Sequence, residues 1–488
     1  MTFITNLQQM LWSTFDKGVK VFTVAFILFL LLSPWRFPVF LGLCIIFLIN
    51  KEQQWLRCLS ERLSRVFVRH TNKCALLILL LGILLRLGMF WVVKDSLSAP
   101  YDSDAGAFLQ KVESLSVGIW PANKSWMTVL VYTGWGKVFS TSYLSLSICG
   151  NILQVITIIL AFVIGRKLFG PVGGVIIEGY VAFDLMSIVL SNAIYLENVY
   201  YMIALMVVFV TSKMDATSSL LKSLILAILS AIFAWCMIWT RSDGIVFLIA
   251  LVLLYVFKSF CRKGDYSFLK LCVLGITSLS LAFFSFFVNI KTDDSKTIFC
   301  SNDNYIPRVM GVNYRSKGSW DSRVIKELKQ RYIADNPEKR EQIERNTIKQ
   351  PYPYMNELVP YCKEMIHEFT NSLTLWQWIE LIWIKEITIF WGNLSIMPNS
   401  RIITYALSMY RNSIITLLCL PIVFTLWQKT REVQFVNYLF AITAAGTMLL
   451  YVLGEVSPRY GQLLFLLLTI TCASQFRITK HNLDEKLK

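Results

Sequence analysis

The sequence predicts an all-α polytopic membrane protein of about 12 transmembrane helices with one larger extracytoplasmic loop domain. Hydrophobic residues make up 55% of the chain, more than the roughly 45–50% of a soluble domain. The mean hydropathy is +0.55. The apolar residues form blocks that are nearly free of charge, among them residues 75–89, 152–164, 220–237 and 271–288. Blocks approaching about 20 residues are typical of membrane-spanning helices, and so many of them argue against a soluble protein.

The formal net charge of +16 is informative about membrane topology, because many basic residues lie in short connectors between the apolar blocks. Basic residues crowd the connectors at residues 51–73, 166–167 and 258–263. Cytoplasmic loops carry an excess of Lys and Arg, so these connectors are expected to face the cytoplasm, and nucleic-acid binding is not expected. The compact chain, its short cytoplasmic loops and the lack of a retention signal favour a multi-pass protein of the bacterial plasma membrane over one of the endoplasmic reticulum.

The spans are expected in a fixed order along the chain. The first two, at 21–32 and 39–49, form a hairpin because the prolines between them end helices. Seven core spans follow near residues 74–93, 144–165, 172–190, 198–211, 220–239, 245–257 and 268–290, with an amphipathic segment at 126–139 after the first of them. Three more close the chain near 413–428, 435–454 and 462–474.

The polar loop at 291–370 is the only sizeable soluble region, and it contains a charged helical run at 322–348. Residues 373–391 are rich in Trp and carry Glu380, Lys385 and Glu386, which favours a helix in the membrane interface. A full crossing there would place the basic connector 429–431 on the outer side. The predicted domains are a hairpin with its basic connector (1–73), a seven-span catalytic module (74–290), the loop with the interfacial helix (291–391) and the C-terminal spans (392–488).

With both termini cytoplasmic, the turns that are rich in carboxylate or arginine face outward together with the long loop. Ionisable groups at membrane depth are costly and usually face a polar interior. We therefore expect a polar chamber at the outer leaflet. Its candidate residues are Asp102, Asp104, Glu197, Arg241, Asp243, Lys385, Arg459 and Tyr460.

Transfer of a sugar from a lipid phosphate needs both signs of charge. The acceptor hydroxyl loses a proton to a carboxylate base, for which Asp102 and Asp104 are the candidates. Fixed cations stabilise the phosphate that leaves. The remaining candidates are predicted to bind substrate, with Arg241, Lys385 and Arg459 as phosphate partners. Four of these residues also have a structural alternative. It is a helix cap for Arg241 and Asp243, a snorkelling side chain for Lys385 and an interfacial anchor for Arg459.

An ordered series of short motifs resembles the GT-C membrane glycosyltransferases, which include the protein O-mannosyltransferases and the lipid A aminoarabinose transferases. The motifs are Leu85-Arg86-Leu87, Tyr101-Asp102-Ser103-Asp104, residues 165–170, Tyr195-Leu196-Glu197-Asn198, Trp239-Thr240-Arg241, Ile384-Lys385-Glu386 with Phe390-Trp391, and Glu455 with Pro458-Arg459-Tyr460. The resemblance implies a seven-span module beneath the long loop and a polyprenyl-phosphate sugar donor. Two departures are the extra N-terminal hairpin and the paired aspartates, of which Asp102 is the better match to the family's catalytic residue.

The predicted function is an integral membrane glycosyltransferase that moves a sugar from a polyprenyl-phosphate donor, favoured to be undecaprenyl phosphate, to an extracytoplasmic glycan, lipid or protein. A transporter or flippase, or a polymerase or ligase of lipid-linked saccharides, is the alternative. No cofactor is expected, because no nucleotide-binding glycine pattern occurs, and His70, His367 and His481 form no metal-binding cluster. Cys300 and Cys362 share the long loop and could pair in an oxidising compartment.

Overall fold

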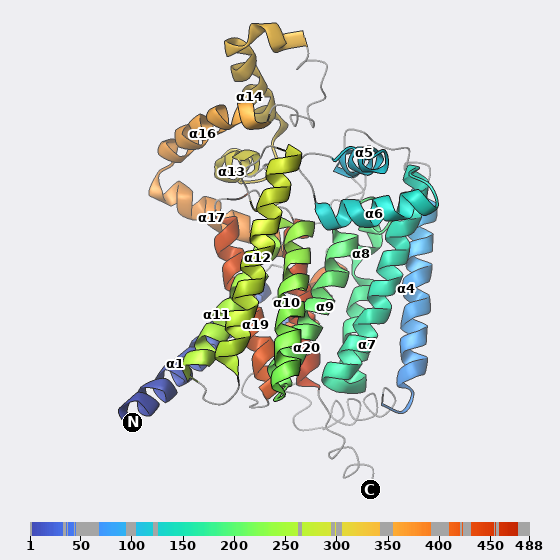
Figure 1. The fold of residues 1–488 in the computed structure, drawn as a ribbon, viewed down its shortest axis with the longest axis vertical. Coiled ribbons are helices and arrows are strands. Elements are labelled where there is room, and N and C mark those ends of the chain that lie inside the picture. Colours follow the sequence, from blue (N-terminus) through green and yellow to red (C-terminus); the bar gives the residue numbers. More distant parts are fainter. Residues whose placement is uncertain are drawn as a thin grey trace.

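The computed structural model (Figure 1) contains helices throughout the part that it describes, and no strand occurs within that part. The described residues are 2–32, 36, 38–42, 44, 68–93, 104–120, 125–261, 266–293, 298, 305–341, 355–391, 409–419, 422, 431–452, 454 and 458–476.

A bundle of long apolar helices forms the body of the molecule. Seven helices of the described residues are long and apolar enough to cross a membrane: α4 (Thr71–Val93), α7 (Tyr143–Phe183), α9 (Glu197–Ala216), α10 (Leu220–Thr240), α11 (Ile245–Cys261), α12 (Ser267–Asp293) and α19 (Arg431–Tyr451). The shorter α20 (Gln462–Gln475) is buried among them. These helices and the composition identify an all-helical membrane protein. The total of about 12 spans stays a prediction.

Helix α7 is two arms that run in opposite directions. Gly170, with a φ of 85°, breaks the helix just before Pro171. Such a positive φ favours glycine, because a Cβ would be strained there. Gly82 of α4 lies against both Ile158 and Ala182, one residue from each arm, so the two arms stand side by side. The predicted spans at 144–165 and 172–190 therefore correspond to α7 and the short α8 (Leu185–Leu190) that continues its second arm.

The N-terminal helix α1 (Thr2–Leu31) begins well before the predicted start at residue 21. The added turns are stabilised by aromatic packing: the ring of Phe15 stacks on Phe257 of α11 at 4.4 Å, and Trp12 meets Tyr438 of α19 edge-on. Arg36, fully buried after α1, donates to the carbonyl of Phe390 and to the side chain of Asn412. Most of the predicted second hairpin arm at 39–49 lies outside the described residues.

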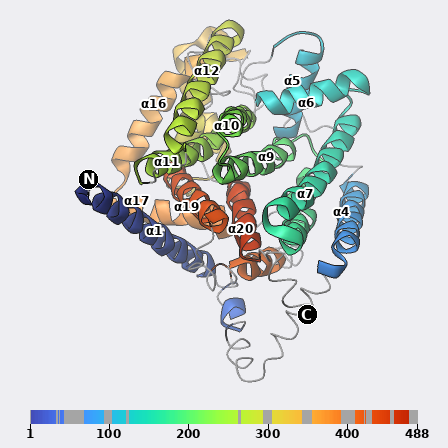
Figure 2. The same cartoon turned by 60° about the horizontal axis from the view of Figure 1, so that its bottom comes forward.

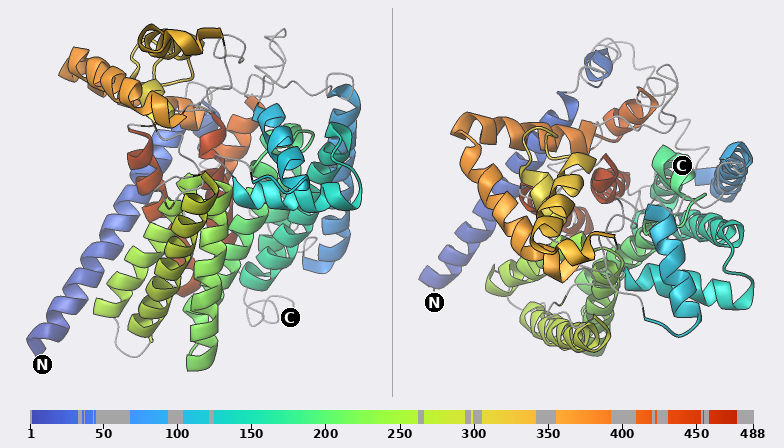
Figure 3. Two further views of the ribbon diagram at one scale, coloured as in Figure 1. Left: turned by 45° about the horizontal axis from the view of Figure 1, so that its top comes forward. Right: turned by 90° about the horizontal axis from the view of Figure 1, so that it is seen from above.

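A small helical domain sits on one end of the bundle (Figures 1 and 3). It consists of α13 (Tyr305–Val312), α14 (Ser322–Asp335), the 3₁₀ turn η3 (Pro337–Lys339) and α16 (Met355–Ser372), packed around their own apolar core. The predicted charged helical run at 322–348 is interrupted after α14, because the chain leaves the helix at Asn336 ahead of Pro337. Residues 342–348 lie outside the described residues. Cys362 is buried in this core, whereas Cys300 lies outside the described residues.

Three further helices lie at the same end of the molecule (Figure 3): α5 (Asp104–Ser116), α6 (Trp126–Val138) and α17 (Leu375–Trp391). Helix α6 covers the predicted amphipathic stretch and buries Val129 and Tyr132 while Leu130 and Val138 stay exposed. The second of three expected C-terminal spans, at 435–454, corresponds to α19, and the third, at 462–474, corresponds to α20. Part of the span at 413–428 lies outside the described residues.

Candidate functional site

Six side chains from four elements meet beneath the small domain, and we call them the Arg241 cluster. They are Glu197 and Tyr200 of α9, Arg241 and Asp243 of the turn between α10 and α11, Tyr451 of α19 and Tyr460 of the 3₁₀ turn η5 (Pro458–Gly461). The turn forms because α10 ends at Thr240 and the short 3₁₀ segment η2 (Ser242–Gly244) leads directly into α11. Helix α9 begins at this level, α10 and α19 end near it, and η5 leads from it into α20.

One guanidinium in this cluster faces two carboxylates. Arg241 Nε lies 2.9 Å from Asp243 Oδ2, and Arg241 Nη1 lies 3.6 Å from Glu197 Oε1. Its Nη2 donates to the hydroxyl of Tyr451 at 3.4 Å. The three ionised groups sum to one negative charge. A phosphate would compete with both carboxylates for Arg241, so the cluster is better suited to holding hydroxyl groups.

Glu197 is the carboxylate in this cluster that keeps acceptor capacity. Its side chain is 2% exposed, and neither of its oxygens accepts a hydrogen bond from the described residues. Buried carboxylates are normally satisfied by hydrogen bonds. Glu197 is therefore placed to accept a hydrogen bond from a hydroxyl that enters the cluster.

Two tyrosine rings line the side of the Arg241 cluster that faces the C-terminal helices. The rings of Tyr451 and Tyr460 stack with their centroids 5.2 Å apart, and the Arg241 guanidinium lies 4.4 Å from the centroid of Tyr460. Tyr451 donates to Asp243 Oδ2 at 2.9 Å, and Tyr200 lies 3.4 Å from Asp243 Oδ1. Flat aromatic faces beside carboxylates suit a ligand with an apolar ring face and hydroxyl edges.

A buried polar network fixes the backbone next to Glu197. The Asn198 side chain accepts from Gln154 at 3.1 Å and donates, each at 3.0 Å, to the hydroxyl of Tyr132 and to the carbonyls of Leu190 and Ala193. These partners belong to α6, α7, α8 and the turn before α9. The position of Glu197 thus depends on helices that are distant in sequence.

Lys385 lies outside the Arg241 cluster. It is buried in α17 and donates to the carbonyls of Gly311 at 3.0 Å and Val452 at 2.7 Å, so it joins the small domain to the end of α19. Gly318, with a φ of 76°, packs so closely on its stem that a Cβ would lie 2.7 Å from it. Burial lowers the pKa of Lys385 to about 7, opposed by the adjacent Glu386.

We expect Lys385→Met to lower the stability of the purified protein by about 1–3 kcal/mol, because two buried carbonyls lose their donor. The loss should grow between pH 7 and pH 9. The folded-state pKa of Lys385 lies below the ordinary value, so the unfolded chain holds more protons in this window, and the wild type gains stability as the pH rises. Thermal unfolding at both pH values measures this. An equal loss with the exposed-site control Lys222→Met would contradict it.

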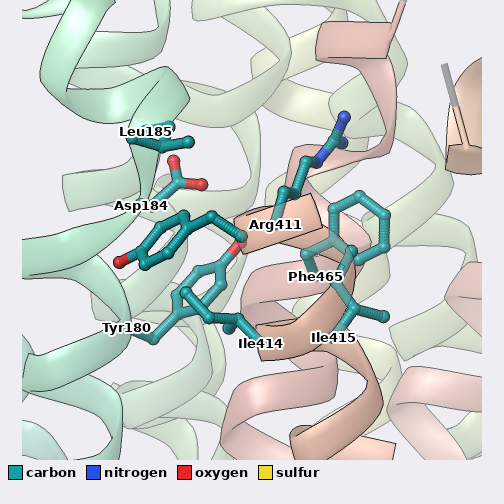
Figure 4. Close-up of a pocket in the computed structure, with 8 residues that line it drawn as sticks. Tyr180, Asp184, Leu185, Arg411, Ile414, Ile415 and Phe465 are labelled. Carbon is teal, nitrogen blue, oxygen red and sulfur yellow. The ribbon is translucent and has the colours of Figure 1, made fainter. Parts of the chain in front are cut away.

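A second polar group lies between α7, α20 and the helical residues 409–419 (Figure 4). Asp184 and Arg411 line a cavity of about 10 Å³ together with Tyr180 and Phe465, a volume that suits about one water molecule. Asp184 caps α8 by accepting from the Ser187 N–H and hydroxyl, while the Arg411 guanidinium lies 4.9 Å from the Phe465 ring centroid. The cavity is too small for a sugar.

The structure brings together four of the eight residues predicted as site residues: Glu197, Arg241, Asp243 and Tyr460. Asp102 lies outside the described residues. Asp104 begins α5 and Arg459 lies in η5, but their side chains are not among those described.

Sequence reasoning missed Tyr200, Tyr451 and Arg411. Tyr200 had a signal, since it lies three residues after Glu197 and so shares its helix face. Arg411 also had a signal in the sequence, because it is a charged residue at the start of an apolar run. Tyr451 had none, because it looks like any interfacial tyrosine. Within the described residues, no group of three His, Cys, Asp or Glu side chains is arranged to hold a metal ion.

No protein-family model matches the chain, and no curated protein sequence matches it. Among solved structures, it is similar to the crystal structure of the Archaeoglobus fulgidus oligosaccharyltransferase in complex with zinc and sulfate, with 11% sequence identity and a TM-score of 0.33. The alignment covers 84% of this chain and 49% of that chain, so this chain spans about half the length of the oligosaccharyltransferase.

Proposed function

We propose that the protein is a membrane glycosyltransferase that uses a polyprenyl-phosphate sugar donor and an extracytoplasmic acceptor. The observation that supports the proposal is the Arg241 cluster: a buried carboxylate with free acceptor capacity, a second carboxylate held by an arginine, and stacked tyrosines, all at the bundle end that carries the small domain. The order of the sequence motifs supports the same activity.

In this proposal the cluster holds the sugar. Glu197 accepts a hydrogen bond from a sugar hydroxyl, while Tyr451 and Tyr460 pack against the apolar face of the ring. Asp243 borders the same sugar and is held by Arg241, Tyr451 and Tyr200. Arg241 holds the two carboxylates in place. The assignment of the lipid phosphate to Arg241, Lys385 or Arg459 stays a prediction.

The reaction itself needs a base and a stabilised leaving group. Asp102, with Asp104 as the alternative, takes the proton from the acceptor hydroxyl as its oxygen attacks the anomeric carbon. The bond from that carbon to the phosphate oxygen breaks, and the lipid phosphate leaves with the bonding electrons. Helix α5 begins at Asp104, so this part of the chain belongs to the bundle end that carries the cluster (Figure 1).

The wider proposal retains the architecture expected from the sequence: a catalytic module at 74–290, the loop domain with α17 at 291–391, and about 12 spans in a bacterial plasma membrane with the site facing outward.

The test is transfer of label from a radiolabelled polyprenyl-phosphate sugar pool in membranes that contain the wild type, Asp102→Asn or Asp104→Asn. We expect wild-type membranes to consume donor and form a glycan product, and one of the variants to be slower by about a hundredfold or more. Glu113→Gln, an exposed carboxylate on α5, is the matched control and should be unchanged. If the wild type moves intact lipid-linked sugar across the membrane without cleaving it, the protein is a flippase instead.

A further inference from the structure

A cavity of about 50 Å³ lies at the far end of α9 from the Arg241 cluster. Helix α9 begins at Glu197 and ends at Ala216, and 20 residues of helix span about 30 Å. The cavity is therefore on the side of the bundle opposite the small domain (Figures 1 and 2). One water molecule needs about 10–15 Å³ by this measure, so there is room for a larger polar group.

Three elements form this cavity. Lys167 and Phe169 come from the first arm of α7, just before the break at Gly170, while Ser212 and Lys213 come from the last turns of α9. Phe435, near the start of α19, also lines the cavity. Lys167 therefore lies beside the C-terminal end of α9.

Among the described residues that line this cavity, the charges are mostly positive. Lys167 and Lys213 are two of them, and the one carboxylate in that described lining, Asp215, forms a buried ion pair with Lys258. The Lys258 side chain is 4% exposed and its ammonium lies 4.9 Å from the centroid of the Phe435 ring. Lys258 thus neutralises the charge of Asp215. Lys167 and Lys213 then give the described lining a net positive charge.

Ser212, which lines the same cavity, has a buried hydroxyl without a hydrogen-bond partner among the described residues. Ser212 is 6% exposed, and its Oγ makes no hydrogen bond with the described residues. Leaving a buried polar group without a hydrogen-bond partner is unfavourable. Ser212 lines the cavity, so a ligand there would satisfy it.

We propose that this cavity binds a phosphate group, with Lys167 and Lys213 as cationic partners and Ser212 as a hydroxyl donor. Ammonium and hydroxyl groups all donate to phosphate oxygens, and lysine binds phosphate as a point charge. The phosphate belongs to a phospholipid headgroup of the leaflet at this end of the bundle or to a soluble phosphate ester. The site is separate from the Arg241 cluster and does not depend on glycosyl transfer.

The experiment measures binding to the purified full-length protein in detergent by native mass spectrometry and thermal shift. Three probes separate the sources: dioleoylphosphatidylglycerol, dioleoylglycerol without phosphate, and glycerol 3-phosphate. We expect the phospholipid to bind and dioleoylglycerol not to bind. Binding of glycerol 3-phosphate as well would assign the site to phosphate esters in general, and its failure to bind would assign it to headgroups.

The variants test the residues. Lys167→Gln combined with Lys213→Gln should weaken phosphate binding about tenfold or more, as expected for the loss of charge-assisted hydrogen bonds. Ser212→Ala should weaken binding a few-fold without lowering the melting temperature of the ligand-free protein, because its hydroxyl makes no hydrogen bond with the described residues. Lys222→Gln, an exposed lysine at the start of α10, is the matched control. Three results would overturn the proposal: equal binding of all three probes, binding of none of them, or an effect of Lys222→Gln as large as that of the double lysine variant.

Discussion

Replacement of Arg241 by leucine is expected to reduce sugar transfer about a thousandfold. Arg241 is the one cation in direct contact with both Glu197 and Asp243 in the described structure, at 3.6 and 2.9 Å. Without it, two carboxylates repel each other in a water-poor site, and neither keeps its position. Loss of one preorganised electrostatic group costs about a hundredfold to a thousandfold in other enzymes, and here the carboxylates are disturbed as well.

The same substitution should lower stability by about 2–4 kcal/mol. Breaking a fully buried ion pair by removing one partner costs about 3–5 kcal/mol. We expect less here, because the side chains of Arg241 and Asp243 are 13% and 17% exposed. Chemical unfolding of the purified protein measures the loss, and Arg323→Leu, at a side chain that is 78% exposed, is the control.

A double variant separates organisation of the cluster from direct contact with substrate. Adding Glu197→Gln to Arg241→Leu removes the repulsion and should restore about 1–2 kcal/mol of the lost stability. Transfer should stay low, because Glu197 is proposed to contact the sugar. If transfer by Arg241→Leu is within tenfold of wild type, the cluster does not hold the sugar and the proposed function loses its main support.

The second large effect is expected from Asn198→Asp, a change of one atom in the side chain. The amide nitrogen of Asn198 lies 3.0 Å from each of three oxygen atoms, among which its two N–H groups are shared. A carboxylate oxygen in its place would face the same three atoms, of which the two carbonyls can only accept. The side chain is fully buried, so water cannot relieve the conflict.

We expect Asn198→Asp to lower stability by about 3–5 kcal/mol, the cost of an uncompensated buried charge. The loss should shrink as the pH falls, because a protonated aspartic acid regains one donor. The chemical unfolding midpoint at pH 5 and pH 8 measures this. Asn371→Asp, an exposed amide on α16, should be neutral at both pH values. An Asn198→Asp protein as stable as the wild type would contradict the assigned network.

The sequence predicted the membrane helices well, because long apolar blocks leave few alternatives. It placed the break between two spans at residues 166–171, because Arg166 and Lys167 interrupt the apolar run there. It missed the first turns of α1, because their stability comes from Trp12 and Phe15 packing on helices far along the chain. A local pattern does not contain such contacts.

The candidate site was predictable in its parts and not in its arrangement. Glu197, Arg241 and Asp243 stood out as charges at span ends. That Arg241 would face both carboxylates depends on how α9 packs on α10, which no spacing reveals. Lys385 was equally conspicuous, yet its hydrogen bonds go to two backbone carbonyls that only the folded chain brings near.

The reversal within α7 has a consequence for how this protein tolerates change. Two arms meet there across a single left-handed residue, and a Cβ on Gly165 would lie 2.9 Å from the backbone of Gly174. Most connectors between membrane helices accept added residues, and epitope tags are placed in them to map which side of the bilayer they occupy. The turn at Gly170 is too closely packed to accept an inserted tag. An insertion between Gly165 and Gly174 would separate the arms, and the sidedness of this part of the chain is better probed by labelling single cysteines.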